Sequence, residues 1–125
     1  GLVACGGFSY GDVLGAGGDS FSMFDVMNQA YKICRLNDYN LDPVKAFYLT
    51  TLAAAKVLNM SDCLGNFEPN KEADFIVLDL NATELLTQRL KTASDINDLL
   101  FCLMTLGDDR LVSKVYILGQ CAYQK

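Results

Sequence analysis

The sequence predicts an α/β protein, and three observations support this fold class. Two long segments, residues 20–36 and 42–58, place apolar side chains three and four positions apart, as amphipathic helices do. A run of consecutive apolar residues, 75–78, follows a turn rich in Gly, Pro and Asn and is typical of a strand. Two last apolar segments, 112–118 and 121–123, are separated by two turn residues and predict a hairpin. The chain has 125 residues, so we expect one domain at most.

Composition argues against several classes of partner. Lys and Arg total 10 against 15 Asp and Glu, and the net charge of −5 disfavours binding to nucleic acid or to an anionic membrane. No apolar run approaches the roughly 20 residues of a membrane span. The sequence shows no secretory leader, so we expect a cytoplasmic protein with reduced thiols. Five cysteines form no CxxC pair and are each expected to be buried as small apolar residues: Cys5, Cys34, Cys63, Cys102 and Cys121.

The first predicted helix begins behind Ser20 or Ser22 and runs to about Leu36. Either serine hydroxyl can accept a backbone N–H of the first turn. The residues expected on its apolar face are Met23, Met27, Ala30, Tyr31 and Cys34.

The second predicted helix begins behind Asp42, with Pro43 at its first position, where the missing N–H costs nothing. It extends to about residue 58. The residues Ala53–Ala55 add so little side-chain bulk that another backbone could approach closely there. The face expected to be buried consists of Val44, Phe47, Tyr48, Leu52, Ala55 and Leu58.

The strand predicted at residues 74–80 has consecutive apolar members, which indicates burial on both of its faces. Short helices are expected at residues 84–90 and 95–106. The residues expected to face inward from the second of these are Leu99, Leu100, Leu103 and Leu106. The hairpin is expected to turn at Gly119-Gln120.

An acidic turn precedes this hairpin. Asp108 and Asp109 could suggest acid–base chemistry, but a solvated turn is favoured. There Arg110 would form a surface ion pair with one of the two carboxylates.

The first 18 residues differ in composition from the remainder. They hold seven of the ten glycines and a single charged residue, Asp12. Residues 2–5 indicate a short buried strand, and residues 6–11 a glycine-rich loop. We therefore predict a boundary between a glycine-rich N-terminal segment, residues 1–18, and a second region, residues 19–125.

Residues 65–79 resemble the closing motif of the amidohydrolase superfamily, Gly…Gly-Lys-x-Ala-Asp followed by a strand. Asn70 stands where the family usually has glycine, and Asn tolerates positive φ, so the same turn is expected. Further segments resemble the guanine deaminases of that superfamily, and the likeness covers about residues 19–125. These segments are Ser20–Met23, Asn28–Lys32, Ala46–Leu49 with Thr51 and Leu52, Asn66–Pro69, and Met104–Arg110.

The resemblance implies the C-terminal piece of a (β/α)8 barrel plus strands of a small β-sandwich, whose other strands come from the N-terminal part. It also implies guanine catabolism within purine metabolism: zinc-assisted hydrolysis of guanine to xanthine and ammonia. The family's zinc site uses several histidines and one aspartate. Asp12 is the nearest match to that aspartate, and the chain contains no histidine. We therefore expect no catalytic residue in the chain and little activity from it alone. Its substrate-binding residues are unknown.

Residues 1–17 resemble a different enzyme, the glutaminase part of phosphoribosylformylglycinamidine synthase. The two resemblances overlap at Asp12-Val13 and at Gly15-Ala16-Gly17. One hypothesis is that two unrelated enzyme pieces are joined at this shared sequence. The alternative to a deaminase function is a non-catalytic fragment or fused domain, which acts by self-association or by complementing a partner chain that holds the N-terminal barrel.

Overall fold

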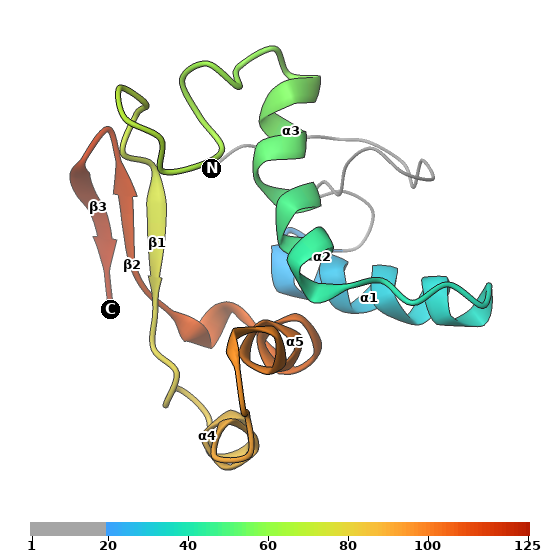
Figure 1. Ribbon diagram of the computed structural model, residues 1–125. Coiled ribbons are helices and arrows are strands. Elements are labelled where there is room, and N and C mark those ends of the chain that lie inside the picture. Colours follow the sequence, from blue (N-terminus) through green and yellow to red (C-terminus); the bar gives the residue numbers. More distant parts are fainter. Residues whose placement is uncertain (1–19) are drawn as a thin grey trace.

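The structure is a computed structural model and describes residues 20–125 (Figure 1). It confirms the α/β class: the helices lie on one side and a sheet on the other. The strand and loop predicted within residues 1–18 lie outside the described residues. The described elements are α1 (Met23–Leu36), α2 (Pro43–Thr50), α3 (Leu52–Val57), β1 (Phe75–Leu78), α4 (Glu84–Leu90), α5 (Ile96–Leu106), a 3₁₀ turn (Asp109–Leu111), β2 (Val112–Ile117) and β3 (Gln120–Gln124). None of the helices between residues 20 and 125 combines the length and the apolar character that a membrane span needs.

Helix α1 begins behind Ser22, one of the two serines predicted to cap it. The hydroxyl of Ser22 accepts the N–H of Asp25 at 3.5 Å, so Ser22 is the N-cap. Met27 and Ala30 of the predicted apolar face are buried, whereas Met23, Tyr31 and Cys34 are half-buried. Phe24, which the prediction does not include, is also buried.

The segment predicted as one helix, residues 42–58, is two helices in the structure. It breaks at Thr51, whose backbone has φ −122° and ψ −93°. The hydroxyls of Thr50 and Thr51 both donate to the carbonyl oxygen of Phe47, at 2.9 and 2.7 Å. Such local bonds compete with the helical ladder for backbone carbonyls, which explains a break without Gly or Pro.

The buried face of α2 also differs from the prediction. Ala46 and Leu49 are buried, whereas Val44 and Tyr48 are exposed. The ring of Tyr48 lies 5.6 Å from the ammonium nitrogen of Lys56, and its hydroxyl accepts a 3.5 Å hydrogen bond from that nitrogen. Tyr48 is amphipathic, and it therefore lies at the surface against the solvated Lys56. The small Ala46 faces the core in its place.

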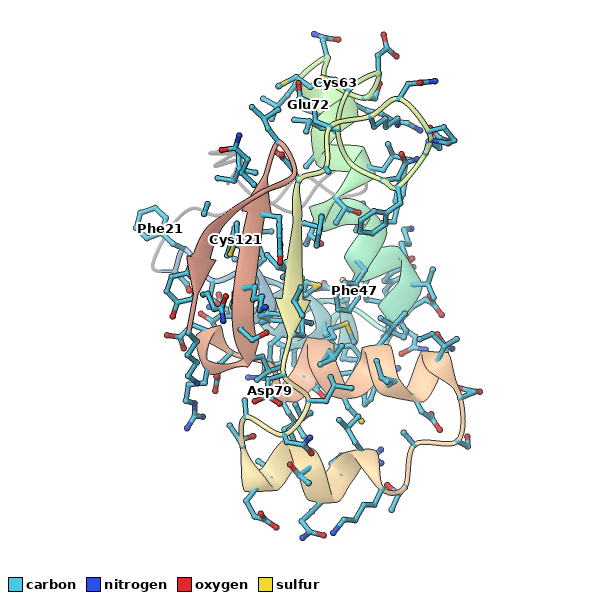
Figure 2. All side chains as sticks on the ribbon, turned by 90° about the vertical axis from the view of Figure 1, so that its left-hand side faces the viewer. Phe21, Phe47, Cys63, Glu72, Asp79 and Cys121 are labelled. Atoms are coloured by element: carbon cyan, nitrogen blue, oxygen red, sulfur yellow. The ribbon has the colours of Figure 1, made fainter. Side chains whose placement is uncertain are left out.

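The connection that follows α3 packs tightly against it, as the run Ala53–Ala55 predicts. Gly65 has φ +101°, and a Cβ there would lie 2.9 Å from both Cα of Leu52 and Cβ of Ala55. Figure 2 shows the other end of this connection, where the N–H of Glu72 donates to the carbonyl of Cys63 at 2.9 Å. Gly65 is therefore required both for its backbone conformation and for its small size.

The sheet is an antiparallel meander of order β1-β2-β3. Its hairpin turns at Leu118-Gly119, one residue earlier than predicted. Both turn residues have positive φ, 51° and 74°, as a type I′ turn requires.

The predicted burial of residues 75–78 is wrong. Ile76 is 48% exposed and Val77 is 38% exposed, and no residue of the three described strands is buried. The reason is that the described hydrophobic core consists of helix and loop side chains, and the strands reach it only at Leu78 and Val112. The largest fully buried side chains are Met27, Leu86, Met104, Leu111 and Cys102.

Substituting Gly107→Ala should destabilise the helical core by about 1–3 kcal/mol, because it overpacks a filled site. A Cβ on Gly107 would lie 2.8 Å from Cδ1 of Phe24 and closer still to the carbonyl oxygen of Leu103. Urea unfolding measures the change. The Phe24→Leu variant provides the matched control, because a shorter side chain should reduce the added cost of Gly107→Ala. Equal costs in the two backgrounds would contradict the proposed contact.

Candidate functional site

The described residues do not fit a zinc site. Among residues 20–125, no three His, Cys, Asp or Glu side chains gather closely enough to hold a metal ion. Asp12, the aspartate selected from sequence, lies outside the described residues.

A shallow apolar hollow of about 470 Å³ lies beside α4 and α5. It is lined by Leu80, Leu90, Ala93, Ser94, Asp95, Ile96 and Leu99. Its one carboxylate is already used, because Oδ1 of Asp95 accepts the N–H of Asp98 at 2.9 Å and so caps α5. The hollow thus lacks the convergent polar groups that mark a ligand site.

The motif at residues 65–79 holds the loop between α3 and β1 in place. Asn70 has φ 71°, which confirms the left-handed turn predicted for it. The Lys71 side chain is only 9% exposed, and its ammonium lies 3.0 Å from Oε2 of Glu68. This hydrogen bond holds the pKa of the Glu68 carboxyl below its usual value, and a further bond with Asn66 lowers it as well.

Asp74, the last residue of the signature motif, joins the connection to the hairpin. Its Oδ1 accepts the N–H of Leu118 at 2.7 Å, and the neighbouring Ala73 carbonyl accepts the N–H of Gly119 at 3.0 Å. Both turn residues of the hairpin are therefore held by the residues that precede β1. The motif aspartate has a structural role in this region.

The acidic turn before β2 carries the ion pair expected from sequence. Nε of Arg110 lies 3.1 Å from both carboxylate oxygens of Asp108, and one terminal nitrogen lies 2.6 Å from Oδ2. The hydrogen bonds from Arg110 lower the pKa of Asp108. Asp108 also accepts the N–H of Arg110 and caps the 3₁₀ turn.

Two of the segments that resemble guanine deaminases meet between α1 and α5. Nδ2 of Asn28 donates to the carbonyl of Thr105 at 2.6 Å. The rings of Tyr31 and Phe101 meet edge to face, with centroids 5.4 Å apart. Sequence reasoning missed the Asn28 bond, because Asn28 reads as a surface residue until α5 is placed beside it. These segments hold two helices together.

The cysteines of the described residues differ in burial. Cys102 is buried as predicted, whereas Cys34 and Cys63 are half-buried. The prediction for Cys121 is wrong: it is exposed, because its strand β3 lies at the edge of the sheet (Figure 2). Cys5 lies outside the described residues.

Residues 6–121 match the model of the amidohydrolase family. The chain is 44% identical to guanine deaminase of Escherichia coli (strain K12) over 115 residues, which is 92% of this chain and 26% of that protein. It is 30% identical to guanine deaminase of Homo sapiens over 114 residues, which is 84% of this chain and 25% of that protein. The chain thus spans about a quarter of the length of these curated relatives.

Solved structures give a consistent result. The structure matches E. coli guanine deaminase with a TM-score of 0.84 at 44% identity, covering 86% of this chain and 25% of that one. Guanine deaminase from Bradyrhizobium japonicum matches with a TM-score of 0.76 at 34% identity, covering 86% and 29%. An adenosine deaminase from Xanthomonas campestris with bound zinc shares the fold, with a TM-score of 0.62 at 22% identity over 79% of this chain and 21% of that one.

The Asp74→Ala variant should lose about 1 kcal/mol of stability, because the Leu118 N–H loses its acceptor. Asp74→Asn keeps an oxygen at the same position and should be nearly neutral. Urea unfolding of both variants, with the amide shift of Leu118 followed by NMR, tests this role. Equal stability of the Ala variant and the unsubstituted chain would show that the bond contributes nothing.

The Arg110→Gln variant should raise the pKa of Asp108 towards its ordinary value of about 3.9. A carboxyl with a lowered folded-state pKa adds stability above its unfolded pKa and loses that contribution as the pH falls through the folded value. The variant should therefore differ most from the unsubstituted chain near neutral pH and least in strong acid. NMR titration of the Asp108 carboxyl carbon measures the shift, and Lys91→Gln is the control at an exposed site.

Proposed function

This chain belongs to the amidohydrolase family, and we propose that it forms one region of a guanine deaminase. The observation that carries the proposal is the similarity to E. coli guanine deaminase in both sequence and structure. Because the chain spans a quarter of its relatives, the conversion of guanine to xanthine and ammonia is proposed for the complete enzyme. In that enzyme the region would be the C-terminal piece of the barrel with strands of the small sandwich. The enzyme would be cytoplasmic and would act in guanine catabolism.

Zinc is the proposed cofactor of the complete enzyme, where it would make bound water a nucleophile at neutral pH. Residues 20–125 supply no site for it. We propose Asp12 as a ligand, since carboxylate oxygens bind zinc. The match to the E. coli protein supports this, because any span of 115 residues within 125 includes residues 11–115 and thus Asp12. The family match, which begins at residue 6, includes it as well.

The boundary at residue 18 also stays a proposal. Glycine content supports a separate N-terminal segment, residues 1–18. The match to the E. coli protein reaches back at least to Gly11, and so it includes the shared residues Asp12-Val13 and Gly15-Ala16-Gly17, where we propose the join.

The second candidate function is non-catalytic: the chain would act by association, with itself or with a complementary barrel segment. The exposed sheet favours this candidate, because none of its residues is buried in the described part of the chain. Zinc content and xanthine formation by the purified chain separate the two candidates. Stoichiometric zinc with turnover would refute the non-catalytic function.

A graft tests the deaminase proposal directly. We expect E. coli guanine deaminase to keep zinc and to form xanthine when its matching quarter is replaced by this chain. In the graft, Asp12→Asn should reduce zinc content and activity at least tenfold, whereas Asp62→Asn, at an exposed position in the connection, should leave both unchanged. A folded graft that binds zinc but forms no xanthine would overturn the proposed function. Full activity of the Asp12→Asn graft would overturn the role of Asp12.

A further inference from the structure

Phe21 is held in a defined position immediately before α1. The Oγ of Ser20 accepts the N–H of Ser22 at 3.1 Å, and Ser22 in turn caps the helix. These two hydrogen bonds hold the backbone on both sides of Phe21. The side chain itself is 84% exposed, and Figure 2 shows its ring projecting away from the ribbon. The chain therefore presents this ring to its surroundings at a fixed place.

Phe21 does not make the contact that is usual for an apolar residue at its position. A residue that precedes an N-cap often packs against the fourth residue of the helix, which here is Val26. Val26 packs against the helical core instead, and Phe21 stays exposed. Stabilisation of the start of α1 therefore does not explain the aromatic side chain.

Phe21 also differs from the four other exposed aromatic residues among residues 20–125. Each of these four lies against a lysine ammonium, against another ring or opposite a residue of the neighbouring strand. The pairs are Tyr39 with Lys45, Tyr48 with Lys56, Phe67 with Phe75, and Tyr123 with Val115. Within the described residues, Phe21 has no such partner, and both faces of its ring are open to a ligand.

The proposed function places the start of α1 at the catalytic face of the complete enzyme. In a (β/α)8 barrel each helix follows a strand, and the loops between the strand ends and the helix starts build the active site. Asp12, the proposed zinc ligand, lies in the segment that leads into α1. A ring that directly precedes α1 therefore belongs to the same face of the barrel as the proposed metal site.

We propose that Phe21 is a substrate-binding residue, whose ring stacks on the flat purine ring of guanine in the complete enzyme. This inference rests on the proposed function and assigns to residues 20–125 a direct contact with the substrate. Ligand pockets are lined mainly by apolar and aromatic side chains, and aromatic rings stack in offset pairs. Stacking recognises the flat ring of a base and not its substituents, so Phe21 sets the affinity for the purine ring and not the choice among purines.

The graft into E. coli guanine deaminase tests this contact. Phe21→Ala should raise the KM for guanine about fivefold or more and leave kcat within about twofold, because a contact made equally in the ground and transition states changes KM alone. Phe21→Tyr keeps the ring and should keep the original KM. Leu36→Ala is the matched control: Leu36 is also 84% exposed but lies at the other end of α1, so its loss should leave KM unchanged. Zinc content should be the same in every variant.

The outcomes separate this contact from the proposed function. An unchanged KM in Phe21→Ala overturns the contact. A loss of zinc or of folding stability in Phe21→Ala, with KM unchanged, also overturns it, because the ring would then pack against the enzyme. A folded graft that forms no xanthine counts against the proposed function, and equilibrium dialysis with guanine then tests the contact by itself. Weaker guanine binding to Phe21→Ala supports the contact, whereas equal binding, or no binding by the unsubstituted graft, overturns it.

Discussion

The close approach of α1 to α5 at Gly107 is the contact on which the helical part of the structure depends. The Phe24 ring occupies space that any side chain at residue 107 would need. Further along α1, Asn28 bonds the carbonyl of Thr105 and the ring of Tyr31 contacts that of Phe101. Later residues of α1 thus contact earlier residues of α5, so the two helices run antiparallel. Helices α2 and α4 then pack on α5. One missing Cβ therefore sets the helix separation around which the core is arranged.

Local chemistry explains which features could be predicted from sequence. Some features depend only on residues within three positions of each other. They are the helix cap at Ser22, the left-handed turn at Asn70 and the ion pair of Arg110. The break at Thr51 depends on competition between hydroxyls and the helix ladder, which apolar periodicity does not register. The exposure of the strands depends on which layer is present beside them. A run of apolar residues indicates that a strand needs a covering layer, but it does not show whether that layer is part of the same chain.

The candidate site was less predictable than the fold, for a related reason. The segments that identify the family hold helices, a turn and a connection in place, and two of their residues, Asn28 and Asp74, bind backbone groups far away in sequence. Asp74, for example, matches a motif that precedes a strand, yet its carboxylate serves a hairpin turn 44 residues later. Asp12 was found only through resemblance, because an isolated carboxylate among glycines carries no chemical signal of its own.

The bond between Asn28 and Thr105 has a consequence for how the chain is made. It joins residues separated by 77 positions. At a synthesis rate of about 5–20 residues per second, α5 follows α1 after roughly 4–15 s. During that interval the face formed by Phe24, Met27 and Ala30 lacks its contacts with α5, and α2 is the earlier helix that packs against α1. The apolar face of α1 therefore stays partly uncovered until the synthesis of α5 is complete.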